Sequence, residues 1–348
     1  MAMSAIHAPT APSNVAVELT EVYRNDDFQI TGVTVSKSGR MFVNFPRWSD
    51  RYLNAVVEVM EDGSTNPFPD ESWNRWDSKP ATVRNHFVCV QSVVADDQDS
   101  LWVLDPAAPL LGPVVTGGAK VVRVDLGSNQ VAHVYNFGPE IAKAGSYLND
   151  IRIDTRRKTA YMTDSGVGGI VVLNIESGEA HRALDGDPSV MAEQDISISV
   201  NGKPVIGPNG KPPQFNSDGI ALSSNGEYLY YQALTGANIY RVQTSALRNG
   251  ETPEVEHVAS TFPADGLWMD SEDRLYLSDI NLSAVCRLLP NGTIEALTVD
   301  PRLQWPDTFT QGPDGSMYIT ASHINDAPQF NHGKSTRTEP YTVFKFKA

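Results

Sequence analysis

Short segments in which hydrophobic and polar residues alternate recur along the chain, and each has a polar turn at its centre. Alternation with a period of two is typical of a β-strand with one buried face, and turns such as Asn225-Gly226 join two strands in a hairpin. Each segment therefore predicts a strand, a turn and a second strand. Six such segments align without gaps: residues 31–43, 91–103, 150–162, 218–230, 265–277 and 307–319.

Further β-branched and aromatic stretches predict a third strand after most hairpins, and turns rich in glycine then lead to a fourth. Six repeats of four strands predict an all-β fold, a six-bladed β-propeller with four-stranded antiparallel blades. Its blades pack radially because a single sheet cannot bury both faces. The third strands are expected at residues 120–125, 169–175, 238–243, 284–289 and 341–347.

The sixth repeat has only three strands before the chain ends. We therefore expect residues 15–24 to supply the outer strand of that blade, which would leave the ring without an open edge. Residues 1–348 are then one domain, with residues 1–14 as a flexible N-terminal segment. The largest insertion between repeats, residues 185–216, is rich in proline, glycine and asparagine and is expected, with residues 47–54, to set the specificity.

The net charge limits the classes of molecule that the protein is expected to bind. The 348 residues include 27 basic and 42 acidic ones, a formal net charge of −15. Nucleic acids and anionic membranes are bound through clustered lysine and arginine, so neither is an expected partner. No apolar run reaches the length of about 18 residues that a transmembrane helix needs. A small molecule remains the expected partner, and the oligomeric state stays open.

The N-terminal residues show no charged region followed by an apolar one, so no secretory signal is predicted. This fits a cytoplasmic protein or the mature form of a secreted or periplasmic one. Cys89 and Cys286 fall in opposite blades, and a disulfide needs Cα atoms within about 7 Å. Both are predicted to be free thiols.

An acidic column marks one end of the predicted channel. Carboxylates in corresponding positions of four successive blades would converge there and raise one another's pKa unless a cation neutralises them. Ligation by oxygen alone favours Ca²⁺ first, with Mg²⁺ and Mn²⁺ as alternatives. Aspartate before glycine also forms turns, and this structural interpretation stays open. The first residues of the six inner strands are Thr31, Gln91, Asp150, Asp218, Asp265 and Asp307.

The loops after the second strands are expected to open on the same face. His323, in the last of them, is a candidate acid or base at the channel mouth, although a histidine in a surface loop is a common structural feature. The tryptophans are expected mainly in the core or at the rim. Candidate ligand-binding residues on this basis are Asp164, Gln232, Asp279, Asn281 and Trp268.

Several stretches together resemble the major royal jelly/yellow protein family. They are residues 90–105 (VQSVVADDQDSLWVLD), 148–154 (LNDIRID), 160–165 (AYMTDS), 218–223 (DGIALS) and 240–247 (YRVQTSAL), and the likeness runs from about residue 30 to residue 331. Members of the family are six-bladed propellers. The resemblance implies that fold, and activities that range from pigment chemistry to amine binding and food storage.

The acidic column also resembles the metal site of the gluconolactonase/regucalcin superfamily, in which a Glu, two Asn and an Asp hold a divalent cation for lactone hydrolysis. This resemblance implies Asn149, Asp218 and Asp265 as metal ligands, with Asp265 also a candidate base. Asp218 stands where that family has an Asn, and Thr31 stands where it has the Glu. We add Asp307 as a further expected ligand, because it belongs to the same acidic column.

Three functions remain in competition. The first is a metal-assisted hydrolase of the lactonase type, in which Asp265 or Asp150 activates water. The second is an isomerase or tautomerase that acts on a small aromatic compound, with a carboxylate or His323 as proton shuttle. The third is a non-catalytic propeller that binds a small ligand or amine in an acidic channel mouth.

Overall fold

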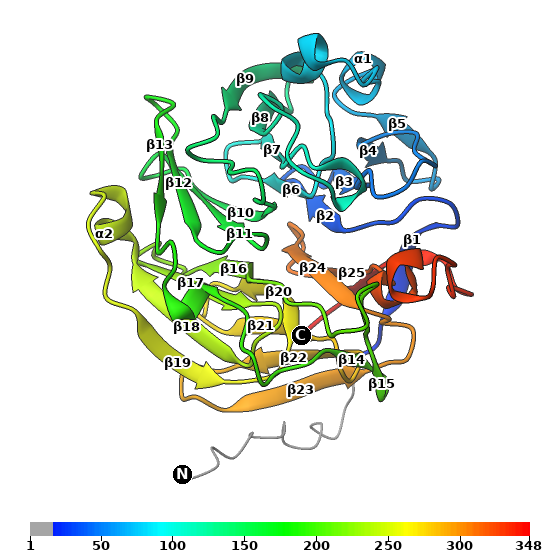
Figure 1. Ribbon diagram of the computed structural model, residues 1–348, viewed down its shortest axis with the longest axis vertical. Helices are drawn as coiled ribbons and strands as arrows, with labels where there is room; N and C mark the ends of the chain where they lie inside the picture. The colour runs from blue at the N-terminus through cyan, green and yellow to red at the C-terminus, as the bar shows by residue number, and fades with distance from the viewer. Residues whose placement is uncertain (1–16) are drawn as a thin grey trace.

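The computed structural model describes residues 17–348 and confirms the six-bladed propeller with four-stranded antiparallel blades. Figure 1 shows the first strand of each blade near the centre of the ring and the remaining strands further out. From the channel outward the blades are β2 (Gly32–Val35), β3 (Met41–Asn44), β4 (Val56–Val59), β5 (Thr65–Pro67); β6 (Ser92–Ala95), β7 (Ser100–Asp105), β8 (Lys120–Asp125), β9 (Gln130–Asn136); β10 (Leu148–Asp154), β11 (Thr159–Asp164), β12 (Ile170–Asn174), β13 (Ala180–Ala183); β16 (Ser217–Leu222), β17 (Tyr228–Ala233), β18 (Asn238–Gln243), β19 (Glu256–Ser260); β20 (Ala264–Met269), β21 (Leu275–Asp279), β22 (Ala284–Leu288), β23 (Ile294–Val299); and β24 (Pro306–Gln311), β25 (Met317–Ala321), β26 (Tyr341–Phe346), β1 (Thr20–Asn25).

The N-terminal strand closes the last blade, as the repeat count predicts. β1 pairs antiparallel with β26, from Thr20 opposite Lys345 to Asn25 opposite Tyr341. The strand begins five residues later than the expected range 15–24, of which residues 15 and 16 lie outside the described residues, as does the predicted flexible segment 1–14. The pairing covers the edge that β26 would otherwise present to solvent.

The core lies between neighbouring blades. Large side chains of the second strands fill the space between sheets, as the alternation predicts, and such burial contributes about 1.5–3 kcal/mol for each large apolar side chain. Trp102, for example, packs in one cluster with Ile151 and Met162 of the next blade. The residues that the ungapped alignment places in one column are all buried: Phe42, Trp102, Tyr161, Leu229, Tyr276 and Tyr318. In blade four the strand pairing corrects that column by one residue, because Tyr230, which is half-buried, and not Leu229 is level with Tyr276.

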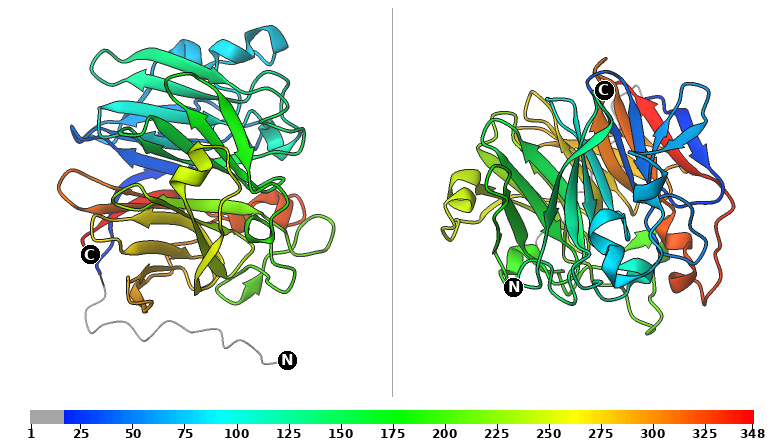
Figure 2. Two further views of the ribbon diagram at one scale, coloured as in Figure 1. Left: turned by 90° about the vertical axis from the view of Figure 1, so that its left-hand side faces the viewer. Right: turned by 90° about the horizontal axis from the view of Figure 1, so that it is seen from above.

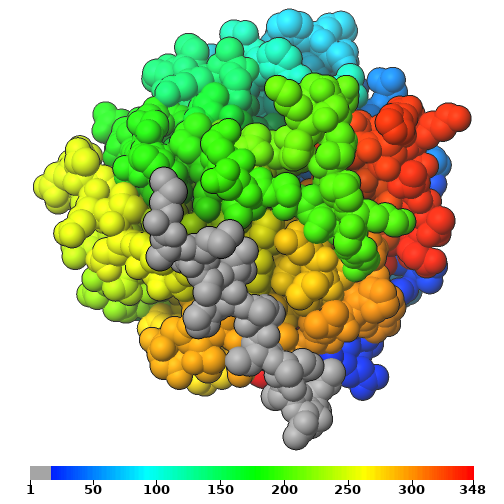
Figure 3. All heavy atoms as spheres, turned by 60° about the horizontal axis from the view of Figure 1, so that its bottom comes forward, coloured from blue at the N-terminus to red at the C-terminus, as the bar shows by residue number. Residues whose placement is uncertain are grey.

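Residues 185–216, the insertion between blades three and four, lie across one face of the ring. The insertion contains the hairpin of β14 (Ser199–Val200) and β15 (Lys203–Pro204). Its apolar residues Ile198 and Val205 form a small cluster with Trp305 and Phe330. Figure 3 shows its light green atoms against the red segment near residue 330, and Figure 2 shows it on the same face as several short helical turns. The helical elements on that face are α1 (Glu71–Asn74), η1 (Pro80–Asn85), η2 (Pro109–Leu111), η3 (Pro188–Val190), η4 (Ile324–Asp326) and η5 (Pro328–Phe330). The helix α2 (Thr244–Arg248) lies instead beside the β16–β17 turn, where Thr244 Oγ1 donates to the Gly226 carbonyl.

Two smaller predictions are also tested. Cys89 and Cys286 are free, buried thiols, as their placement in opposite blades predicts. Within residues 17–348, no helix has the length and apolar character needed to cross a membrane.

Candidate functional site

The inner strands of blades three to six share a local irregularity at the acidic column. In β10 the pairing register with β11 shifts by one residue between Leu148 and Ile151, and equivalent shifts occur in β16, β20 and β24. An extra residue of this kind is a β-bulge, which bends the strand and re-aims a side chain. The four aspartates of the column all lie within these bulges, but not in corresponding positions as predicted: Asp218, Asp265 and Asp307 take the first bulge position, whereas in β10 Asn149 takes the first and Asp150 the second.

Hydroxyl groups of the second strands stabilise three of the bulges. Ser278 Oγ accepts hydrogen bonds from the backbone N–H groups of Asp265 and Gly266, at 3.2 and 2.8 Å. Thr163 and Thr320 serve the bulges of β10 and β24 in the same way. These bonds satisfy buried donors that the bulge removes from the strand ladder. The aspartates are therefore part of the sheet itself and not residues of the connecting turns.

Asp218 and Asp265 form a buried carboxyl pair at the centre of this arrangement. The two carboxyl groups lie within hydrogen-bonding reach of each other, and both residues are at least nine-tenths buried. Asn149 Nδ2 donates to Asp218 Oδ2 at 2.6 Å, and Trp305 Nε1 donates to Asp265 Oδ2 at 2.6 Å. The pair is therefore held by donors from two further blades.

Burial and mutual charge perturb the titration of this pair. Burial, with the charges of Asp265 and Asp307 next in importance, raises the pKa of Asp218 well above its ordinary value. Burial raises the pKa of Asp265 to about 6, although the hydrogen bonds from Trp305 and Asp218 oppose the rise. Two carboxyls in one dry space retain a proton at neutral pH unless a cation replaces it.

The other two aspartates of the column are already engaged. Asp150 accepts hydrogen bonds from Ser92 Oγ at 2.8 Å and from the Arg152 guanidinium at 2.9 Å. Asp307 accepts from Ser322 Oγ and Thr308 Oγ1, and burial together with the charge of Asp265 raises its pKa well above the ordinary value. Of the four carboxyls, only the Asp218–Asp265 pair lines the open space above the channel.

We call that space the upper cavity; it measures about 260 Å³. Its floor is polar, and apolar and aromatic side chains make up most of its walls, a combination typical of small-molecule sites. Tyr147 fixes one wall: its hydroxyl accepts from Trp48 Nε1 and donates to Gln91 Oε1. The floor residues are Gln91, Asn149, Ser165, Asp218 and Asp265, and the principal wall residues are Trp48, Tyr147, Phe215, Leu234, Trp305 and Phe330.

None of the five predicted ligand-binding residues lines the upper cavity, and four of them bond to nearby backbone or side chains instead. Asp164 is fully buried, accepts hydrogen bonds from its own loop and pairs with Arg182 at 2.9 Å. Gln232 and Asp279 are likewise buried and bond to loop backbone. Asn281 holds the insertion by accepting from Ser199 N. These side chains satisfy the backbone of the very loops on which their polarity suggested a binding role.

The structure separates two further candidates from the carboxyl pair. His323 is buried, bonds through Nδ1 to Asp326 Oδ2 at 3.1 Å and lines a different cavity, beside the β14–β15 hairpin. Trp268 lies three residues beyond Asp265 on β20, at the opposite end of the channel. Neither touches the upper cavity: the His323 side chain is held by Asp326 while its neighbour Ile324 lines the cavity, and β20 runs along the channel from one end to the other.

Arg152 is the important channel residue that the acidic column does not reveal. It lies two residues after Asp150 on β10, so strand alternation places both side chains on the same face. That spacing was a usable signal in the sequence. The guanidinium supplies, from within the chain, part of the positive charge that the column requires.

The fit of a divalent cation depends on the remaining oxygen donors. Thr31 Oγ1 accepts from Asn44 and donates to the Gln91 carbonyl, so this position supplies no anionic ligand. Within residues 17–348, no three His, Cys, Asp or Glu side chains are grouped as a metal site. Asn149, Asp218 and Asp265 nevertheless bring an amide and two carboxyls together, which is an oxygen donor set that Ca²⁺ accepts when water completes its shell.

Comparisons with solved structures find other propellers. A gluconolactonase from Xanthomonas campestris has a TM-score of 0.57 and 14% identity, covering 98% of this chain and 97% of that chain. A calcium-binding protein, regucalcin, from Agrobacterium tumefaciens has a TM-score of 0.58 and 14% identity, with coverages of 95% and 93%. Virginiamycin B lyase from Staphylococcus aureus has a TM-score of 0.52 and 14% identity, with coverages of 95% and 99%. At these identities the likeness shows the shared fold.

The sequence comparison is more specific. No curated protein matches the chain. The family model for major royal jelly proteins matches residues 88–321, which include the inner strands of blades two to six and all four aspartates of the column. Because this match extends over more than half of its length, the chain belongs to the major royal jelly protein family.

Proposed function

We propose that the protein is a small-molecule hydrolase of the lactonase type whose site is the upper cavity. The observation that carries this proposal is the buried Asp218–Asp265 pair at the floor of a cavity with apolar walls. A carboxyl group with a pKa near 6, as burial gives Asp265, is suited to accept a proton from water at neutral pH. The gluconolactonase among the structural neighbours supports the same reaction class.

Each residue of the site has a definite task in this proposal. Asp265 is the general base, and the Trp305 indole holds its carboxylate in one orientation. Asn149, Asp218 and Asp265 would hold the divalent cation, with Ca²⁺ the favoured ion; when bound, it supplies polarisation of the substrate carbonyl. Asp150, already paired with Arg152, contributes negative charge beneath the site and is not the base. Asp307 lies outside the proposed ligand set, because two hydroxyl groups engage it.

A second candidate function is binding of a small organic amine without turnover. The same observation favours it, since an ammonium group can neutralise the carboxyl pair in place of a metal ion while aromatic walls cover an apolar body. The isomerase hypothesis has weaker support, because His323, one of its two candidate proton shuttles, lies in another cavity and only a carboxylate of the upper cavity remains for that role.

The test compares metal binding and turnover in the same variants. Asp218→Asn and Asp265→Asn should each weaken Ca²⁺ binding by roughly 10-fold or more and abolish hydrolysis of any lactone that the protein cleaves. Asp62→Asn, in an exposed turn, is the matched control and should change neither. The measurements are calcium titration calorimetry and a panel of five- and six-membered lactones with and without chelator.

The outcome separates the two functions. Calcium binding with lactone turnover supports the hydrolase. Saturable binding of a small amine such as benzylamine, lost in Asp218→Asn, together with no turnover of any lactone, would overturn the hydrolase in favour of the amine-binding propeller.

A further inference from the structure

Loops from different blades supply apolar side chains to the upper cavity above its floor. The partly exposed contributors are Trp48 in the loop after β3, Leu111 in η2, Phe215 in the insertion and Phe330 in η5. Leu111 is 47% exposed, and the three aromatic side chains are half-buried. Partly exposed apolar side chains that converge on one cavity are typical of a surface that an apolar ligand covers.

The polar atoms of the aromatic walls are already bonded within the protein. Trp48 Nε1 donates to the Tyr147 hydroxyl at 2.7 Å, and this hydroxyl donates to Gln91 Oε1 at 2.9 Å. Trp305 Nε1 donates to Asp265 Oδ2 at 2.6 Å. The two indoles and the phenol therefore offer a ligand the carbon atoms of their rings and no free donor.

Few other polar side chains line the cavity away from its floor. Ser146 Oγ accepts from the backbone N–H of Lys143. Gln214 is exposed and donates to the Pro213 carbonyl. Gln329 is half-buried, and its amide forms no hydrogen bond with another residue in the range 17–348. A ligand that carries several hydroxyl groups would therefore bury most of them without partners, which is unfavourable.

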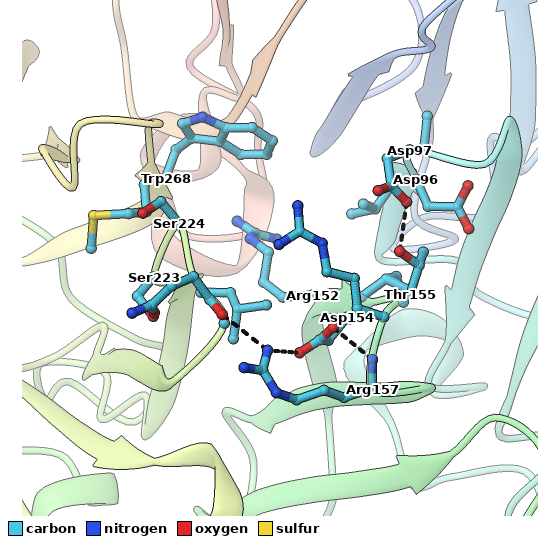
Figure 4. Close-up of a pocket in the computed structure, with 17 residues that line it drawn as sticks. Asp96, Asp97, Arg152, Asp154, Thr155, Arg157, Ser223, Ser224 and Trp268 are labelled. Carbon is cyan, nitrogen blue, oxygen red and sulfur yellow. Dashed lines mark hydrogen bonds and ion pairs between the residues drawn. The ribbon is translucent and has the colours of Figure 1, made fainter.

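The cavity at the other end of the channel has a different lining. It measures about 270 Å³, and Figure 4 shows charged side chains around it. Asp154 pairs with Arg157 at 2.9 Å, and Asp97 accepts from Thr155 Oγ1 at 2.7 Å. Of the described residues, Trp268 alone contributes an aromatic ring to this lining, whereas five residues contribute one to the upper cavity. Aromatic surface therefore gathers at the end of the channel that also holds the carboxyl pair.

We propose that the substrates of the upper cavity are lactones with an apolar substituent, and not polyhydroxylated sugar lactones. This inference rests on the hydrolase proposed above. The lactone carbonyl would face the floor, and the substituent would lie against the aromatic walls. A cavity of about 260 Å³ is suited to one small ring with a short substituent.

The reaction that this places in the cavity is the addition of water across the ring ester bond. Asp265 accepts a proton from the water molecule whose oxygen bonds to the carbonyl carbon. The bond between that carbon and the ring oxygen then breaks, and the ring oxygen takes up the proton. The product is a hydroxy acid that carries the substituent unchanged, so the walls contribute to binding and not to the chemical step.

Three six-membered lactones test the substrate class in the presence of Ca²⁺. They are δ-decalactone, which carries a pentyl chain, unsubstituted δ-valerolactone, and D-glucono-δ-lactone, which carries hydroxyl groups. Intrinsic reactivity is removed by dividing each kcat/KM by the uncatalysed rate constant. The resulting enhancement should be roughly 10-fold or more higher for δ-decalactone than for δ-valerolactone, since each fully buried methylene contributes about 4-fold. It should be lowest for D-glucono-δ-lactone, whose hydroxyl groups lose water without gaining partners.

Wall variants connect this preference to the cavity. Phe215→Ala and Phe330→Ala should each lower kcat/KM for δ-decalactone by roughly 10-fold and change that for δ-valerolactone by less than about 3-fold, because the floor stays intact. Phe28→Ala is the matched control: it removes an equally half-buried phenylalanine outside the upper cavity and should change neither value. Turnover of δ-valerolactone also shows that each variant is folded.

Failure of this inference is distinct from failure of the hydrolase. An enhancement for D-glucono-δ-lactone that equals or exceeds that for δ-decalactone would overturn the apolar substrate class and leave the hydrolase in place. The same holds for δ-decalactone turnover that neither phenylalanine variant affects. No turnover of any of the three lactones would overturn both proposals.

Discussion

The inner strands of blades one and two differ from those of blades three to six at the channel mouth. β2 and β6 pair in regular register with their neighbours, and Thr31 and Gln91 immediately precede them. The other four inner strands contain a bulge, and each bulge carries an aspartate. Acidic groups thus occur where the backbone leaves the regular ladder, which indicates that the irregular backbone and the acidic column form one structural unit.

The regular pair of blades closes its end of the channel through hydrogen bonds. Asn44 Nδ2 donates to Thr31 Oγ1 and to the carbonyls of Val90 and Gln91, which ties blade one to blade two. The bulged blades instead direct carboxyl groups at one another. The two regular blades are therefore joined by hydrogen bonds of neutral groups, with only Asn44 Oδ1 among these atoms left without a partner. The four bulged blades instead retain a need for positive charge that a proton, a cation or a ligand can meet.

The largest predicted effect tests the positive charge that Arg152 supplies among the four bulged blades. Arg152→Met leaves Asp150 buried without its ion-pair partner and should lower the free energy of unfolding by about 3–5 kcal/mol. The double variant Arg152→Met with Asp150→Asn should recover much of that loss. Urea denaturation measures both. Equal stability losses in the single and double variants would show that Arg152 acts through packing and not by neutralising Asp150.

The next effect concerns pH. Because burial raises the pKa of Asp265 from 3.8 to about 6, the folded state holds a proton that the unfolded chain releases. Its contribution to stability is fully present below pH 3.8 and is lost as the pH rises through about 6, a change on the order of 3 kcal/mol. Asp218 extends the loss to higher pH. Chemical denaturation between pH 4 and pH 8, with chelator present, measures it.

The same experiment on variants contrasts the bulged blades with the regular ones. Asp218→Asn with Asp265→Asn should flatten the pH dependence of stability, since it removes the coupled carboxyls. Gln91→Ala, beside a regular inner strand, should leave the slope unchanged. A slope that persists in the double aspartate variant would place its origin outside the carboxyl pair.

The smallest effect addresses the bulge itself. Ser278→Ala removes the acceptor for two buried N–H groups of the β20 bulge and should cost about 1–3 kcal/mol. Thr34→Val is the matched change on the regular inner strand β2, where Thr34 Oγ1 accepts from Ala95 N. Both should lower the melting temperature, but only Ser278→Ala should also weaken calcium or ligand binding in the upper cavity. Equal binding by the two variants would separate the bulge from the site.

Local pattern was sufficient to predict the blades. The aromatic and β-branched second strands, the Gly-containing turns and the missing fourth strand of the sixth repeat together indicate where each strand lies and why β1 returns to β26. Third strands such as Lys120–Asp125 and Asn238–Gln243 fall on the expected residues. This success has a simple cause: a period of two and hairpin chemistry act between residues close in sequence.

The candidate site was predictable only in part. Strand position identified Asp218 and Asp265 and, through the family resemblance, Asn149. Polarity in a loop was a poor guide, because Asp164, Gln232 and Asp279 bond to the loop backbone around them. Trp305 was expected in the core or at the rim, and no local signal marks it as the donor to Asp265, a residue 40 positions away.

By itself the sequence determined the repeat, the strands, the closing of the ring and the presence of aspartates at one end of the channel. Tertiary structure alone decided which residues meet: that Asp218 and Asp265 form a pair, that Arg152 neutralises Asp150, and that His323 lies apart. The physical reason is the distance along the chain over which each interaction acts. Strand formation depends on neighbours along the chain, whereas burial, hydrogen-bond partners and pKa depend on atoms that different blades bring together across the channel.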